Sequence, residues 1–208
     1  HAVTAFKLAQ ELNPENPYYN NSLAYSYIKA ELYDDAIEYY QNAIRLNPDA
    51  EWTSIVCHAL GAIYAEVKNN YEAAEATFNA GMVLDPNNVD IQLSLGDLYM
   101  AQNDLDKAIK TYCDAIAVDT DNYLTYAKTG LALWEKDYLE EAIVAFHKSI
   151  ELNPNFEIAQ NNLGVVYLDG MGDPKESVDY FKNAININPN YTLAYFNLGR
   201  AYQAIGDK

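Results

Sequence analysis

Side chains that could carry catalysis or hold a metal occur singly in this 208-residue chain. The three histidines are His1, His58 and His147, on unrelated segments, and the two cysteines are Cys57 and Cys113. Zinc ligands and cysteine nucleophiles need partners at set spacings, and neither a His-Glu-x-x-His pattern nor a glycine-rich phosphate loop is present. We therefore predict that the chain is not an enzyme and holds no cofactor and no metal ion.

Carboxylates are abundant: 30 Asp and Glu residues stand against 13 Lys and Arg residues, which gives a formal charge of −17. Asp34-Asp35 and Glu140-Glu141 fall where helices are predicted to begin. Acidic side chains there favour the helix dipole, so we interpret both pairs as helix starts and not as acid–base catalysts. Nucleic acids and anionic membranes require basic surfaces, so neither is a predicted partner. No apolar run reaches about 18 residues, so no membrane insertion is predicted.

Acidic residues are densest from Asp85 to Asp121, where eight Asp accompany only Lys107 and Lys110. Two interpretations stay open: a solvated surface that keeps the protein soluble, or a surface that attracts a basic partner. The cysteines have no metal-ligand spacing and are interpreted as buried free thiols. Free thiols favour a reducing compartment, so a cytoplasmic location is predicted.

The stretch 89–122 shows which elements position these side chains. Leu95, Gly96 and Tyr99 share one face of a predicted helix, and the stripe of a second helix is Ala108, Tyr112 and Ala115. A polar turn at 102–104 separates them. Such a hairpin is marginal by itself, because a short helix needs an apolar neighbour.

The same helix–turn–helix pattern recurs along the chain at intervals of about 34 residues. The first-helix signature also occurs as Leu23-Ala24 with Tyr27, Leu60-Gly61 with Tyr64, Leu163-Gly164 with Tyr167, and Leu198-Gly199 with Tyr202. One copy is degenerate, with Thr129-Gly130 and Leu133. The second-helix pattern of small, aromatic and small residues is centred on Phe6, Tyr40, Phe78, Phe146 and Phe181, and prolines follow most second helices at Pro14, Pro48, Pro86, Pro154 and Pro189.

This pattern resembles the tetratricopeptide repeat (TPR) family over essentially the whole chain. The resemblance implies an all-α fold, a right-handed superhelical solenoid of antiparallel helix pairs. We predict one array over 1–208, with complete repeats at 15–48, 49–86, 87–120, 121–154 and 155–189 and partial repeats at 1–14 and 190–208. Extra residues near Glu51 are expected to lengthen the helix there. The stretch from Leu163 to Pro174 is also similar to the related Sel1-like repeats, so its turn is expected to protrude.

In this family the first helices line the concave side, where ligands lie, so the resemblance implies a protein–protein interaction scaffold that binds a peptide or helical segment. The face opposite the signature is apolar on several helices, and Trp134 is the predicted anchor. Asparagines that match the peptide-gripping ladder of the O-linked N-acetylglucosamine transferase arm occur in two of six repeats. The positions of the family's carboxylate clamp are not matched. The predicted groove residues are Asp90, Leu93, Asp97, Met100, Leu124, Leu131, Trp134, Ile158, Asn162, Val165 and Asn197.

Two further questions stay open at this stage. The helix around Leu131 is apolar on both faces, so it is covered either by neighbouring repeats or by a peptide or second protomer. The last helix presents Leu198, Tyr202 and Ile205 without a following helix, which predicts self-association through exposed terminal helices.

The predicted partner is a protein or peptide that is basic and amphipathic. The alternative function is the substrate-recruiting TPR arm of a larger enzyme such as a glycosyltransferase.

Overall fold

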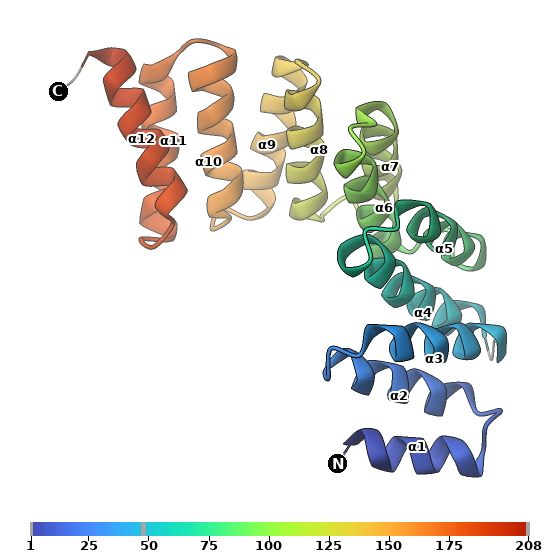
Figure 1. The fold of residues 1–208 in the computed structure, drawn as a ribbon. Helices are drawn as coiled ribbons and strands as arrows, with labels where there is room; N and C mark the ends of the chain where they lie inside the picture. The colour runs from blue at the N-terminus through green and yellow to red at the C-terminus, as the bar shows by residue number, and fades with distance from the viewer. Residues whose placement is uncertain (1, 47–48, 207–208) are drawn as a thin grey trace. The chain divides into compact units, whose positions relative to one another are not determined.

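The computed structural model describes residues 2–46 and 49–206, and all regular elements within these ranges are helices (Figure 1). The all-α class and the pairing of consecutive helices are therefore confirmed. The α-helices are α1 (Ala2–Leu12), α2 (Pro17–Ile28), α3 (Tyr33–Leu46), α4 (Ala50–Ala62), α5 (Tyr71–Leu84), α6 (Val89–Ala101), α7 (Leu105–Val118), α8 (Tyr123–Glu135), α9 (Leu139–Leu152), α10 (Glu157–Val165), α11 (Pro174–Ile187) and α12 (Thr192–Ile205). Two π-helical segments, η1 (Ile63–Val67) and η2 (Val166–Gly170), extend α4 and α10.

The contacts of the chain gather into two compact units, which divide within α6 between Leu98 and Tyr99. In the first unit, α2 packs against α3 and α4 packs against α5. In the second unit, α8 pairs with α9, α10 pairs with α11, and α12 packs against α11. Four of the predicted complete repeats thus contain one packed helix pair each, and the predicted repeat bounds stay predictions. The continuity of a single array over all residues, and its superhelical shape, stay predictions.

The repeated signature residues form the core of each unit. In the first unit Leu23, Ala24 and Tyr27 of α2 are buried with Tyr40 of α3. In the second unit Leu163 of α10 is fully buried in one cluster with Phe146 of α9. The signature position of α10 is glycine because the partner helix lies too close for a side chain. A Cβ atom at Gly164 would lie 2.7 Å from the ring of Phe181. These core positions are therefore confirmed, whereas Phe6 of α1 is exposed and Leu198 of α12 is half-buried.

Helix starts and turns follow from polar residues at repeated positions. Six helices are preceded by an Asn or Asp whose side chain accepts hydrogen bonds from backbone N–H groups of the first turn. These residues are Asn16, Asp49, Asn70, Asp104, Asn122 and Asp173. Asp34-Asp35 and Glu140-Glu141 lie in the first turns of α3 and α9, as predicted. The turn inside each helix pair has one residue in the left-handed region: Glu31, Asn69, Asn103, Asp137 and Gly172.

The two π-helical segments coincide with one additional residue in the turn. Pro174 follows Tyr167 by seven positions, whereas Leu105 follows the equivalent Tyr99 by six. The added residue widens the last helical turn, so the Met171 N–H donates to the Val166 carbonyl oxygen five positions back, at 2.9 Å. The same insertion produces η1 after α4. The expected lengthening of the helix near Glu51 is thereby confirmed, since helical structure runs from Ala50 through Val67.

One sequence prediction about the cysteines is wrong. Cys57 is buried in α4, and burial raises the pKa of its thiol to about 11. Cys113 is exposed, although it directly follows the buried Tyr112 of α7. Adjacent residues on a helix point about 100° apart, so burial of Tyr112 turns Cys113 toward solvent. Pro48, the predicted stop after α3, lies outside the described residues.

Candidate peptide-binding face

The first helices of the second unit share a face with exposed apolar side chains. Leu124 on α8, Ile158 on α10, and Leu193 and Phe196 on α12 are exposed, and 65% of Phe196 is accessible to solvent. Leu131 and Val165 lie among them and are half-buried. Two of these helices are connected directly, because the Asn197 amide of α12 donates to Asn161 of α10. A run of exposed apolar groups marks a surface suited to a partner.

The predicted groove residues fall in both units and differ in exposure. In the second unit Leu124 and Ile158 are exposed, while Asn197 is buried. The half-buried members there are Met100, Leu131, Trp134, Asn162 and Val165. In the first unit Asp90 and Asp97 are exposed on α6, and Leu93 between them is buried. The second-unit set and the first-unit residues Asp90, Leu93 and Asp97 therefore belong to separate surfaces.

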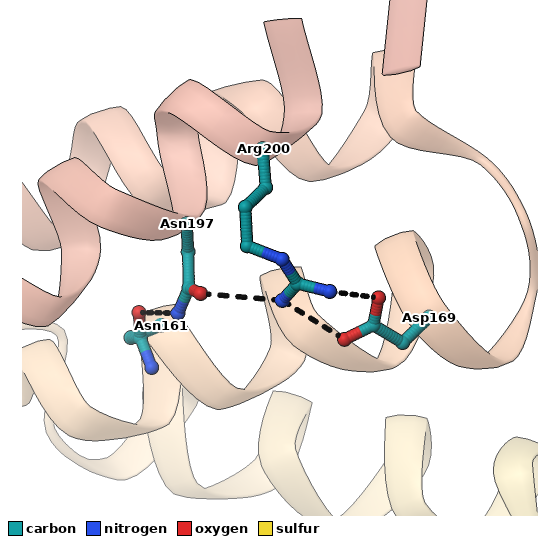
Figure 2. A network of polar contacts seen from close by, with 4 residues as sticks. All are labelled: Asn161, Asp169, Asn197 and Arg200. Atoms are coloured by element: carbon teal, nitrogen blue, oxygen red, sulfur yellow. Dashed lines mark hydrogen bonds and ion pairs between the residues drawn. The ribbon is translucent and has the colours of Figure 1, made fainter. Parts of the chain in front are cut away.

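A polar network connects α10, η2 and α12 at one end of the second-unit face (Figure 2). The Asn197 side-chain amide donates to Asn161 Oδ1 at 3.0 Å, and the Asn161 amide donates to Asn162 Oδ1 at 3.3 Å. Arg200 Nη1 donates to Asn197 Oδ1 at 3.4 Å. The network uses hydrogen-bonding groups of Asn162 and Asn197 inside the protein, which limits what these asparagines can offer to a peptide backbone.

The network ends in a two-point ion pair between Arg200 and Asp169. Arg200 donates from Nη2 to Oδ1 at 2.7 Å and from Nη1 to Oδ2 at 3.1 Å (Figure 2). This forked geometry is specific to arginine and a carboxylate. The sequence reasoning did not select Asp169 as a site residue, because it lies in the π-helical segment. Its position depends on where the extra turn residue is absorbed.

Trp134 lies beside the same end of the second unit. It is half-buried and packs against the core cluster that contains Phe146 and Leu163. Trp134 also lines a cavity of about 400 Å³ with Leu139, Asp169 and Gly170. The indole therefore contributes to packing as well as to the cavity wall.

The first unit has one perturbed imidazole on its first-helix faces. His58 Nε2 and Ser94 Oγ are 2.9 Å apart, which joins α4 to α6. Burial lowers the pKa of His58, and the carboxylates of Asp90 and Glu66 oppose that effect. The imidazole is thus favoured in its neutral form, and its role in this hydrogen bond is structural.

Metal-binding side chains do not gather among the described residues. Across 2–46 and 49–206, no cluster of three or more His, Cys, Asp or Glu side chains is arranged to hold a metal ion. In the same ranges, no helix combines the length and apolar character needed to cross a bilayer.

Sequence models of the tetratricopeptide repeat match most of the chain. Models described as tetratricopeptide repeat match residues 17–50, 125–156, 159–191 and 180–208, and one described as TPR repeat matches 96–137. Among solved structures, "YrrB: a TPR protein with an unusual peptide-binding site" has a TM-score of 0.71 at 22% identity, covering 94% of this chain and 98% of that one. A tetratricopeptide repeat protein from Parabacteroides merdae has a TM-score of 0.80 at 18% identity, covering 92% and 74%.

Curated relatives extend the comparison to named proteins. The peroxisomal targeting signal receptor of Candida albicans is 28% identical over 198 residues, covering 86% of this chain and 31% of the receptor. The receptor of the same name in Saccharomyces cerevisiae is 35% identical over 97 residues, covering 47% of this chain and 15% of the receptor. The chain thus spans less than a third of the length of these relatives. By its repeated signature, its helix pairs and these matches, the chain belongs to the tetratricopeptide repeat family.

Proposed function

We propose that this chain, a protein-interaction scaffold of the TPR type, binds a peptide or a helical segment on the first-helix face of its second unit. The observation that carries the proposal is the set of exposed apolar side chains on α8, α10 and α12. Leu124, Ile158 and Phe196 lie on three successive first helices, and each is accessible to solvent. Stacked helices that offer apolar groups in this way suit helix-in-groove or extended-peptide recognition.

The named relatives support a short segment as the ligand. Five curated relatives are peroxisomal targeting signal receptors, and a receptor of a targeting signal recognises a segment of another protein. The alternative, a recruiting arm of a larger enzyme, is not favoured, because these receptors share higher identity with the chain than the human protein O-mannosyl-transferase TMTC3, which is 24% identical over 190 residues. We keep the absence of enzyme activity and the cytoplasmic location as predictions.

Three finer features belong to the same proposal. Asp90 and Asp97 are exposed on α6 of the first unit and form a surface of their own, where carboxylates would attract basic residues of a partner. In the second unit Trp134, Asn162 and Asn197 contribute to the shape of the site, while the exposed residues make most of the contact. The turn from Asp169 to Pro174 keeps its likeness to Sel1-like repeats as a prediction.

A selected peptide ligand provides the test. A phage-displayed random dodecapeptide library is selected on the purified chain, and the dissociation constants of the enriched peptides are measured by fluorescence anisotropy. Ile158→Asp and Phe196→Asp should each cost about 2 kcal/mol of binding free energy or more, if these side chains are central contacts. Both side chains are exposed, so the melting temperature should change little.

The control is Val83→Asp, which adds the same charge at an exposed position of α5 in the first unit. It should leave binding unchanged. If Ile158→Asp and Phe196→Asp bind the selected peptides as well as the wild type, the proposed face is wrong. Trp134→Ala is informative only with thermal unfolding data, because the indole packs against the core.

A further inference from the structure

A second concave feature of the second unit lies on the other side of α8. It is a pocket of about 660 Å³ between α7, α8 and α9. Its walls are Ile116 of α7, Tyr126 and Thr129 of α8, and Val144 and Ala145 of α9, and its rim carries Glu140, Glu141 and Lys148. Tyr126 and Thr129 lie on the opposite side of α8 from Leu124 and Leu131. The pocket is therefore distinct from the proposed peptide-binding face.

Two departures from the repeat explain why a pocket opens here. Thr129 stands where the first-helix signature has Leu163 in α10, and Ala145 stands where α11 has Tyr180. In the next helix pair Leu163 is fully buried, and Tyr180 stacks on Tyr167 with ring centroids 5.3 Å apart. The larger side chains occupy the space that Thr129 and Ala145 leave empty.

The first unit provides a graded comparison at the equivalent place. In the α2–α3 pair, Tyr39 takes the position of Tyr180 and stacks on Tyr27 with centroids 5.5 Å apart. In the α4–α5 pair this position is Thr77, Leu60 is retained, and a smaller pocket of about 360 Å³ is present. Loss of the aromatic ring alone thus accompanies a small pocket, and loss of both large residues accompanies the larger one.

The lip of the larger pocket is apolar where other repeats are polar or small. Val144 is 68% exposed, and the equivalent positions of α3, α5, α7 and α11 carry Glu38, Ala76, Lys110 and Asp179. The Thr129 hydroxyl donates to the Thr125 carbonyl oxygen at 2.8 Å, so it is already satisfied within α8. The interior therefore suits a hydrocarbon or aromatic group and gains little from a polar one.

The rim adds a charge preference. Glu140 and Glu141 lie in the first turn of α9, and within the described residues neither is paired with a Lys or Arg. The only basic group that lines this pocket, Lys148, bonds to Glu151 at 3.0 Å. The smaller pocket in α4–α5 has Arg45 on its lining instead of the glutamates. The rim of the larger pocket is thus complementary to cations.

We propose that this pocket is a second binding site, which takes one large apolar side chain of a peptide segment whose neighbouring residues are lysine or arginine. Its volume lies within the range of small-ligand and side-chain pockets. The two rim carboxylates would meet the basic neighbours of the inserted side chain. This site is independent of the proposed face on α8, α10 and α12.

The α10–α11 pair supplies three matched variants of the pocket. Each one replaces a pocket residue with the residue type at the equivalent position of that pair. Thr129→Leu and Ala145→Tyr fill the pocket from two sides, and Val144→Asp makes its lip polar. Thr129→Leu should also raise the melting temperature, since it fills a cavity, so a loss of binding could not be attributed to unfolding. A double variant, Glu140→Gln with Glu141→Gln, tests the rim charge without changing shape.

The probes are capped heptapeptides with three lysines on each side of a central leucine, phenylalanine or glycine. Binding is followed by NMR titration of the folded chain at low salt. The leucine and phenylalanine probes should bind roughly tenfold tighter than the glycine probe, because only they bury an apolar side chain. Thr129→Leu, Ala145→Tyr and Val144→Asp should each remove that difference, although Val144→Asp adds a charge that attracts lysine.

The double glutamine variant should weaken all three lysine probes alike and reduce their dependence on salt. Ile158→Asp, on the other face, should leave them unaffected, which separates this proposal from the proposed function. Equal binding of leucine and glycine probes, or full binding by the filled variants, would overturn the site. A glutamate-flanked leucine probe that binds as well as the lysine one would overturn the basic partner. If the chain self-associates and Val144→Asp abolishes that association, the occupant is a second copy of the chain. That result would overturn the proposal that a peptide occupies the pocket.

Discussion

The α8–α9 and α10–α11 pairs are built alike, yet one contains a pocket and the other does not. Both bury a phenylalanine from the second helix, Phe146 or Phe181, against a signature glycine of the first helix. They differ beside this contact, where Thr129 in one pair replaces Leu163 in the other. Both pairs keep the glycine–phenylalanine contact and the packing of their two helices despite this replacement. A neighbouring position can therefore change from a large buried side chain to a small one beside a pocket without a change of fold.

The largest expected effect comes from making the α10–α11 pair, which has no pocket, resemble the α8–α9 pair, which has one. Leu163→Thr should cost about 2–4 kcal/mol of unfolding free energy, because Leu163 is fully buried and the site cannot collapse around a rigid helix pair. Chemical denaturation measures the cost, and a structure of the variant should show a new cavity beside Tyr180.

The matched control is Leu198→Thr in α12, where the same signature leucine is only half-buried. Its cost should be clearly smaller than that of Leu163→Thr. If the two substitutions cost the same, burial at the signature position does not explain the difference between the pairs.

The glycine–phenylalanine contact gives the next effect. A Cβ at Gly164 would lie 2.7 Å from the Phe181 ring, and a Cβ at Gly130 would lie 3.0 Å from the Phe146 ring. Gly164→Ala should therefore cost about 1–3 kcal/mol through overpacking, and Gly130→Ala should cost less. Thermal or denaturant unfolding of both variants gives the order.

Gly199→Ala is the control for helix propensity. A Cβ at Gly199 would meet no atom within 4 Å, because α12 has no following helix against this position in the described chain. Alanine there should stabilise by about 0.5–1 kcal/mol. A loss of stability at Gly199 equal to that at Gly164 would show that contact with the aromatic ring is not the cause.

Much of this comparison could be predicted from the sequence, because the signature repeats at a regular interval. The period located the helix pairs, the buried aromatics and the degenerate copy at Thr129. The pocket could not be predicted, since it needs Thr129 and Ala145 to face the same space across two helices. The exposure of Cys113 and the burial of Leu93 depend on the rotation of single helices. The place of Asp169 depends on the π-helical segment, because an added residue can be absorbed by the helix or by the turn.

A smaller effect is expected from the left-handed residue in each turn. Asp137 in the α8–α9 turn and Gly172 in the α10–α11 turn both have φ of 65°. Asp137→Gly should stabilise the chain by about 1 kcal/mol, and Gly172→Ala should destabilise it by a similar amount. A Cβ at Gly172 would meet no atom within 4 Å, so the backbone conformation is the only cause. Denaturant unfolding should give changes in unfolding free energy of opposite sign for the two substitutions. Changes of the same sign would contradict this explanation.

The smallest effect is expected from removing the one residue by which the α10–α11 turn is longer than the α8–α9 turn. Deletion of Met171 leaves six positions from Tyr167 to the first residue of α11, as from Leu133 to Leu139 in the α8–α9 pair. Gly172 would still occupy the left-handed position. The π-helical segment η2 should then become regular α-helix, because its widened turn accommodates that one residue. Asp169 would rotate away from Arg200, and loss of this partly exposed ion pair should cost less than about 1 kcal/mol. Amide hydrogen exchange and a structure of the deletion variant would check the conversion. The contrary results would be a deletion variant in which a backbone N–H still donates to the Val166 carbonyl oxygen from five positions later, or one that unfolds. Either result would show that η2 is required by packing against α11 and not by turn length.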